Sequence, residues 1–187
     1  AAIGTSVMND EAVLEFDFVP SGDSLVFRYI FASEEYPEYS PSSFNDGFGF
    51  FISGPGFAGP YMNGAVNLAQ LPSPPIPVTI NNVNPTTNSS YYISNAGGTS
   101  TQFDGYTVIL TAACSVQCGE TYHIKLAIAD AGDNAFESAV FLEANSFSSN
   151  GIQVQIASAT GSAAITEACD SAIVTFIRPS DDVSTAL

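Results

Sequence analysis

The sequence predicts an all-β protein built as an antiparallel β-sandwich. Short apolar runs alternate with polar residues at every second position, which is the period of a strand with one buried face. Clusters of Gly, Pro, Asn and Ser separate these runs, as they do in sandwiches and jelly rolls. No segment combines a helical period with capping residues. We therefore expect a jelly-roll-like sandwich with long irregular loops.

The first expected strands carry alternating aromatic residues. Residues 14–18 alternate Leu and Phe with acids, residues 20–23 have turn chemistry, and residues 25–31 continue the alternation. We predict that these two runs form a hairpin. Residues 1–10 lack a period and are expected to be an irregular tail. A further strand is expected at residues 48–52.

The middle of the chain is rich in Pro, Gly, Asn and Ser from residue 54 to about residue 100. Within it only residues 78–83 have an extended pattern, and a stretch of this kind often forms a contact surface. Regular alternation resumes at residues 106–110, 122–128 and 140–144. These runs complete a predicted sandwich domain over residues 1–150.

Residues 151–187 are predicted to begin a second, incomplete β unit, because two strand-like runs follow a linker-like stretch. A segment of this length is too short to bury a core of its own. We expect another chain or fragment to complete it by strand addition, which would permit self-assembly.

The charge balance excludes some classes of partner. The 187 residues contain 19 Asp and Glu against three Lys and Arg, for a formal charge of −16. Nucleic acids and anionic membranes both attract positive protein surfaces, so neither is expected as a partner. No apolar run reaches the roughly 18 residues that a membrane span requires, so we predict no direct membrane insertion.

Two cysteines stand close together in the sequence. Cys114 and Cys118 flank an expected turn, and we predict a disulfide between them and hence an oxidising, extracellular compartment. Two free thiols are the alternative. Cys169 has no evident partner.

Two acidic loops, each following an expected strand, are the candidate functional site. Neither loop contains Lys or Arg. Hard cations such as Ca²⁺ take about six to eight oxygen ligands from carboxylates, amides and backbone carbonyls. If the two loops meet at one end of the sandwich, they supply such a set, whereas ordinary solvated loops are the alternative. The candidate metal ligands are Glu34, Glu35, Asn45, Asp46, Asp130 and Asp133.

Enzyme functions receive little support, and we predict that the protein is not an enzyme. The single histidine, His123, lies within an expected strand, and no common catalytic or nucleotide-binding motif is present. A carbohydrate-binding surface is an alternative, although the chain has no Trp. Its candidate residues are Tyr36, Tyr39, Tyr91 and Tyr92, each of which can equally be a packing residue.

Three long segments resemble the choice-of-anchor L domain over about residues 10–149. They read LEFDFVPSGDSLVFRYIFASEEYPEY, FNDGFGFFISGPG and TYHIKLAIADAGDNAFESAVFLE. The later EACDSAIVTFIRPSDD resembles the start of a Calx-β or immunoglobulin-like repeat. The acidic loops fall within the family's signature segments, which favours the calcium interpretation.

The resemblance implies a secreted, modular surface protein of a kind notable in Bacteroidota, often carrying a type IX secretion sorting signal. We therefore expect an extracellular, outer-membrane-associated, non-catalytic module of an adhesin or gliding-type protein, with Ca²⁺ stabilising the acidic loops. Its expected partners are other protein modules or surface glycans. The alternatives are a carbohydrate-binding module and a filament subunit completed by a neighbouring chain.

Overall fold

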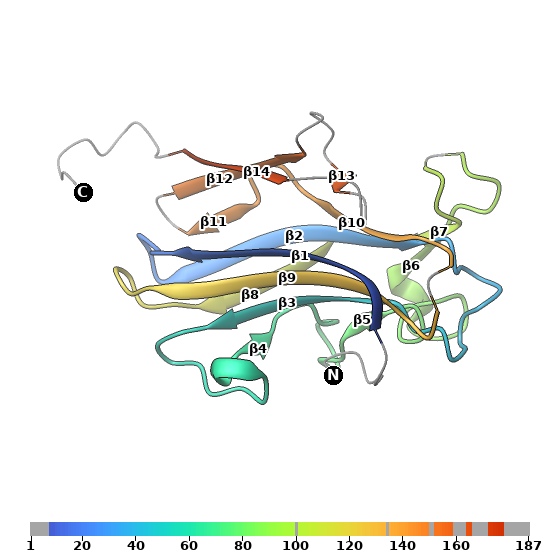
Figure 1. The fold of residues 1–187 in the computed structure, drawn as a ribbon, viewed down its shortest axis with the longest axis horizontal. Helices are drawn as coiled ribbons and strands as arrows, with labels where there is room; N and C mark the ends of the chain where they lie inside the picture. Colours follow the sequence, from blue (N-terminus) through green and yellow to red (C-terminus); the bar gives the residue numbers. More distant parts are fainter. Residues whose placement is uncertain are drawn as a thin grey trace.

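The computed structural model describes residues 8–99, 101–133, 135–149, 152–158, 164–165 and 172–177. Two antiparallel sheets pack face to face, which confirms the predicted all-β sandwich (Figure 1). Within the described residues there is no α-helix, and only two 3₁₀ turns interrupt the loops. These turns are η1 (Met62–Gly64) and η2 (Ser89–Tyr91). No helix among these residues is long and apolar enough to cross a membrane.

The first sheet has the strand order β1-β9-β3-β4, and β5 also pairs with β3. Its two central strands, β9 and β3, are therefore paired on both edges. Their outward-facing side chains form one exposed surface of the molecule. The strand bounds are β1 (Met8–Phe18), β3 (Gly47–Ser53), β4 (Val66–Asn67), β5 (Val78–Thr79) and β9 (Tyr122–Ala131).

The second sheet is organised around β2 (Ser24–Ser33), which pairs with β10 and β11 on one edge and with β8 and β7 on the other. β12 and β14 extend the same sheet beyond β11. The remaining bounds are β6 (Tyr92–Ser94), β7 (Gly105–Thr107), β8 (Leu110–Ser115), β10 (Ser138–Leu142), β11 (Phe147–Ser149), β12 (Ile152–Ser158), β13 (Ala164–Ile165) and β14 (Ala172–Ile177).

Aromatic side chains from both sheets form the core between them. The rings of Phe27 on β2 and Phe50 on β3 lie 5.0 Å apart edge to face, and those of Tyr29 and Phe48 lie 5.1 Å apart. Such pairs contribute roughly 0.5–1.5 kcal/mol beyond their area burial. The alternation along each strand thus directs every second residue into this shared interior.

The predicted hairpin of residues 14–18 and 25–31 is wrong. β1 pairs with β9 in the first sheet, while β2 lies in the second sheet. Alternation specifies which face of a strand is buried, but two strands that face each other across a core alternate in the same way as two paired strands. Residues 8–10 also belong to β1 and are not part of an irregular tail.

The predicted disulfide is also wrong, because Cys114 and Cys118 are both free thiols. Cys114 lies within β8 and packs partly against the core, whereas Cys118 is exposed in the turn that follows. β8 extends through Ser115, so Cys114 belongs to the strand while Cys118 belongs to the turn. Cys169 lies outside the described residues, and the proposed boundary at residue 150 stays a prediction.

One end of the sandwich gathers four strand ends. β2 ends where β10 begins, because Ser33 pairs with Ser138. β3 begins where β9 ends, because Gly47 pairs with Ala129. The loops that enter or leave these ends lie together at the right of Figure 1. This arrangement brings both acidic segments to the same place.

Candidate functional site

Asp46 is the centre of a buried carboxyl cluster at this end. It immediately precedes β3, so the pairing of β3 with β9 places it beside the last residues of β9. Its Oδ1 accepts the backbone N–H of Ala131 at 3.1 Å, and its Oδ2 accepts the hydroxyl of Ser138 at 2.8 Å. Asp46 therefore ties the beginnings of β3 and β10 to the end of β9.

Two further carboxyl groups lie near Asp46. The side chain of Asp130, on β9, is close enough to that of Asp46 for the two carboxyl groups to influence each other's pKa. Glu35 follows β2 and is close enough to Asp46 to feel its charge. The exposed fractions of Glu35, Asp46 and Asp130 are only 1%, 1% and 2%. The structure thus joins the two acidic segments through three buried carboxyl groups.

Burial without a basic neighbour makes these carboxyl groups weak acids. Desolvation raises the pKa of Glu35 to about 7, with smaller contributions from Asp46 and Asp133. Desolvation, followed by the charge of Asp46, raises the pKa of Asp130 to about 8. The pKa of Asp46 is also raised by desolvation, although its hydrogen bonds with Ser138 and Ala131 oppose the change. The two carboxyl groups of Asp46 and Asp130 therefore resist ionising together, because burial and the charge of one raise the pKa of the other.

Two oxygens of the cluster have no hydrogen-bond partner among the residues that the structure describes. They are Oε2 of Glu35 and Oδ1 of Asp130, both fully shielded from solvent. A buried polar atom without a partner costs roughly 1–3 kcal/mol, so such atoms need an explanation. As the described residues stand, however, no group of three or more His, Cys, Asp or Glu is arranged to hold a metal ion. Binding would require side chains of the cluster to rotate toward a common point.

The other predicted ligands are engaged elsewhere. Glu34 accepts the N–H of Glu137 at 3.2 Å, and the amide oxygen of Asn45 accepts the N–H of Asn81 at 3.1 Å. Asp133 accepts the N–H of Ala135 at 3.3 Å and contributes only at a distance to the charge around Glu35. Their hydrogen bonds hold the loops that surround the cluster.

An aromatic group lies in the same loops, and it was not anticipated from the sequence. The ring of Tyr39 lies 5.9 Å from that of Phe44 and 5.2 Å from that of Phe136. Phe44 also packs close to Gly132, where a side chain would meet its ring. The aromatic residues within the acidic segments were a signal for this contact. They join the two loops and add apolar material beside the carboxyl groups.

The comparison with known families identifies the chain. Residues 1–148 match the choice-of-anchor L domain. The chain belongs to this family. Membership implies a cell-surface or secreted protein and a surface-associated module, and the family is not a known enzyme family. Neither the curated proteins nor the solved structures give a significant match.

His123 of this choice-of-anchor L domain lies on the outer face of β9. Its Nδ1 and Nε2 each lie 2.7 Å from a carboxylate oxygen, of Asp17 and Glu15 respectively. The hydrogen bond with Asp17 is the main cause that raises the pKa of His123, and Glu15 adds to it. Both ring nitrogens are therefore occupied by β1, and the histidine links two paired strands.

The tyrosines proposed for carbohydrate binding do not form a common surface. Tyr36 is fully buried, and its hydroxyl donates to the carbonyl of Val83 at 2.6 Å. Its ring packs 5.0 Å from that of Tyr92. Tyr36 is therefore a core residue, and only Tyr39 among the four is classed as an exposed large side chain, at 38%.

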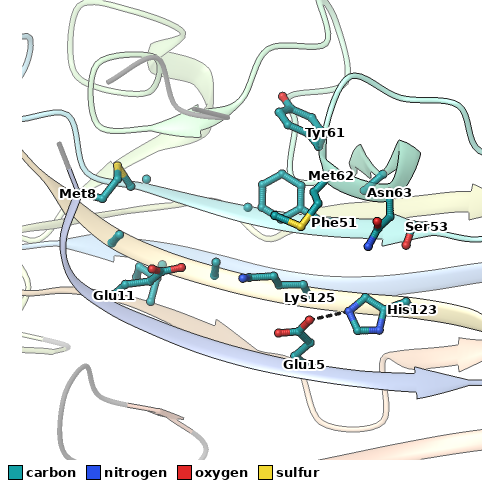
Figure 2. A pocket seen from close by; sticks show the side chains of 16 residues that line it. Met8, Glu11, Glu15, Phe51, Ser53, Tyr61, Met62, Asn63, His123 and Lys125 are labelled. Carbon is teal, nitrogen blue, oxygen red and sulfur yellow. Dashed lines mark hydrogen bonds and ion pairs between the residues drawn. The ribbon is translucent and has the colours of Figure 1, made fainter. Parts of the chain in front are cut away.

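A separate hollow lies on the outer face of the first sheet of the choice-of-anchor L domain. Its volume is about 440 Å³, and Figure 2 shows the side chains around it. The small residues Gly47, Gly49, Ala127 and Ala129 form its floor, where β3 pairs with β9. These residues alternate along two strands, and that pattern was visible in the sequence. Sequence reasoning missed this hollow.

Proposed function

We propose that this choice-of-anchor L domain is a non-catalytic module for adhesion or surface-structure assembly, and that Ca²⁺ stabilises its acidic loops. The observation that carries the metal role is the set of three buried carboxyl groups, two of whose oxygens have no partner. Oxygen-rich, anionic surroundings of this kind suit a hard divalent cation. The ligands would be Glu35, Asp46 and Asp130, supplemented by oxygens of the surrounding loops.

The charges around the cluster favour a bound cation over carboxyl groups that remain protonated. Arg28 forms an ion pair with Glu143, and among the described residues no basic group contributes to the raised pKa values of the cluster. A divalent ion would let all three groups ionise, because its charge offsets the burial that raises their pKa values. Because metal binding then links four strand ends, it would stabilise the loops that contain Tyr39 and Phe136.

Calcium titration of the metal-free protein tests this role. We expect saturable heat in calorimetry and a rise in melting temperature that a chelator reverses. At a hundredfold excess of calcium over Kd, mass action gives about 2.7 kcal/mol of stabilisation. Magnesium should be the weaker ligand, because it demands a more regular and smaller shell. Absence of both heat and a melting shift would reject the metal role and leave a cluster of buried carboxyl groups.

We also propose that the protein is a secreted adhesin or gliding-type protein of Bacteroidota that uses type IX secretion, as the resemblance implies. The supporting observation is the family match over residues 1–148 together with the predicted β unit that follows. Protease accessibility on intact cells tests this placement. We expect the protein to be cleaved on intact cells and to escape cleavage when type IX secretion is blocked. Cleavage that is unaffected by the block would reject the secretion route.

A further inference from the structure

We propose that the hollow on the outer face of β1, β9 and β3 binds a neutral saccharide. It is a site distinct from the carboxyl cluster. The proposal deepens the adhesive role given above and rests on it, but it does not depend on calcium. Its basis is a cavity with one apolar wall, one polar wall and a floor of small residues (Figure 2).

The floor is low because four adjacent outward positions carry almost no side chain. Gly49 pairs with Ala127, and Gly47 pairs with Ala129, so two successive cross-strand rows are small. In the next row, Phe51 pairs with Lys125 and Lys125 with Glu15, and these long side chains bound the hollow. The change from small to large side chains between neighbouring rows creates its depth.

The apolar wall comes from β3 and the loop before β4. The rings of Phe51 and Tyr61 lie 5.0 Å apart, nearly perpendicular. The Phe51 ring leans over Gly49, since any side chain at position 49 would collide with it. Met62, 84% exposed, extends this wall from the turn η1. Aromatic faces of this kind pack against the C–H face of a sugar ring, which is itself apolar.

The polar wall comes from β1 and β9. Glu11 and Lys125 line the hollow, and the side chain of neither forms a hydrogen bond or ion pair with another described residue. Glu15 also lines it and is already bound to His123. A free carboxylate and a free ammonium offer an acceptor and donors for hydroxyl groups. An opposed pair of apolar and polar walls fits a pyranose, whose faces are apolar and whose rim carries hydroxyls.

Charge favours a neutral ligand. Glu15 and Asp17 share His123, and the charges of Glu11 and Lys125 are opposite, so the hollow has no excess of positive charge that would attract an anion. An anionic ligand would meet the field of a chain with a formal charge of −16. We therefore expect acidic sugars to bind more weakly than neutral ones.

The strand pairing argues against an extended peptide as the occupant. β9 is paired with β1 and β3, and β3 is paired with β9 and with β4 and β5. The backbone groups of the floor are thus committed to the sheet, so a peptide cannot add there as a further strand. Recognition must come from side chains, as it does for a saccharide.

The test titrates the full isotope-labelled chain with cellopentaose, laminaripentaose and mannopentaose. An oligogalacturonate serves as the anionic probe, and a short neutral peptide serves as the competing occupant. We expect at least one neutral saccharide to bind and to shift the amide resonances of Gly49, Phe51 and Ala127. No binding of any neutral saccharide at millimolar concentration, or binding of the peptide alone, would overturn the inference.

Variants locate the site. Tyr61→Ala should weaken binding roughly tenfold through loss of the aromatic wall. Ala127→Leu should weaken it at least as much by filling the floor, while Lys125→Met should reduce it with little effect on folding. Tyr39→Ala, an exposed aromatic at the acidic end, is the matched control and should bind normally. Loss of binding in Tyr39→Ala with retention in Tyr61→Ala and Lys125→Met would also overturn the inference.

Calcium response separates the two proposals. A protein that responds to calcium but binds no neutral saccharide rejects the hollow as a sugar site and leaves the metal role intact. A protein that binds a saccharide but ignores calcium rejects only the metal role. Each variant above should remain fully folded at the titration temperature, as its amide spectrum shows, so that its effect on binding does not arise from unfolding.

Discussion

At the scale of single residues, the place of a carboxyl group in the turn that follows a strand decides what it can do. Glu34 and Glu35 are neighbours in the turn after β2, yet Glu35 is buried beside Asp46 while Glu34 accepts a hydrogen bond from Glu137. The backbone N–H of Glu34 also donates to the carbonyl of Glu137, so this residue is tied to the loop before β10 and only Glu35 enters the cluster. Asn45, just before β3, is bound to Asn81 instead.

Asp130→Asn tests the residue that combines a raised pKa with an unpartnered oxygen. In chelator we expect a free energy of unfolding within about 1 kcal/mol of wild type, because the amide has a similar volume and adds no buried charge. With calcium we expect most of the stabilisation to be lost, because an anionic ligand is missing. Calorimetric melting with and without calcium measures both effects.

Asp23→Asn is the matched control for this substitution, because Asp23 is exposed in the turn after β1. It should leave the calcium response unchanged. A full calcium response in Asp130→Asn would remove Asp130 from the ligand set. A loss of response in Asp23→Asn would instead point to a general effect of surface charge.

At the scale of elements, asparagine side chains give order to the long segment between β5 and β6. The Oδ1 of buried Asn84 accepts the N–H groups of Thr86 and Thr87, at 2.9 and 2.8 Å. Its Nδ2 donates to the carbonyls of Ile80 and Asn81, at 3.1 and 3.0 Å. One side chain thus replaces the backbone ladder that a strand would supply.

Asn84→Ala removes this network at its centre. We expect a loss of about 2–3 kcal/mol in the free energy of unfolding, because several buried backbone groups lose their partner. Chemical denaturation measures the loss. Gln102→Ala, at an exposed position between β6 and β7, is the control and should change stability by less than about 0.5 kcal/mol. Equal effects of the two substitutions would contradict the assigned role of Asn84.

His123 links β1 to β9 and gives this pair of strands a pH dependence. Its pKa is raised from 6.5, first by the hydrogen bond with Asp17. A raised pKa means that the protonated histidine stabilises the fold. This stabilisation is complete below the ordinary value of 6.5 and is lost as pH rises through the higher folded-state pKa.

The pH prediction is tested by comparing wild type with His123→Gln. The difference in melting temperature should be largest in mildly acidic buffer and should shrink as pH rises through the folded-state pKa. Because Glu35 and Asp130 are unchanged in the variant, their own titration cancels in the difference. The effect should be small, since the His123 side chain is 40% exposed. A difference that grows with pH would contradict the assignment.

The sequence predicted where the strands lie better than it predicted which strands pair with one another. Periodic apolar residues located β2, β3 and β9 closely, because alternation follows directly from the pleat. Alternation along a strand could not reveal that β1 pairs with β9, because that pairing depends on which sheet each strand occupies. The acidic segments were also located from residues that are neighbours in the sequence. Which carboxyl groups become buried together depends on the pairing of β3 with β9, which no local pattern contains.

At the scale of the whole molecule, the charge of −16 acts on stability independently of the buried cluster. Exposed acids repel one another over roughly 10 Å at moderate ionic strength, and this repulsion opposes the compact state. Sodium chloride should therefore raise the melting temperature gradually and without saturation. Calcium, by contrast, should act at low concentration and saturate, because it occupies a site.

A salt titration in chelator separates these two contributions. Wild type and Glu35→Gln/Asp46→Asn/Asp130→Asn should show similar slopes of melting temperature against sodium chloride, because the triple variant changes only buried groups. In a domain of this size, each kcal/mol of screening corresponds to about 2–4 °C. The calcium response should disappear in the triple variant alone. If the triple variant instead lost its dependence on sodium chloride, the buried cluster would be the main source of repulsion, and the surface acids would contribute little to stability.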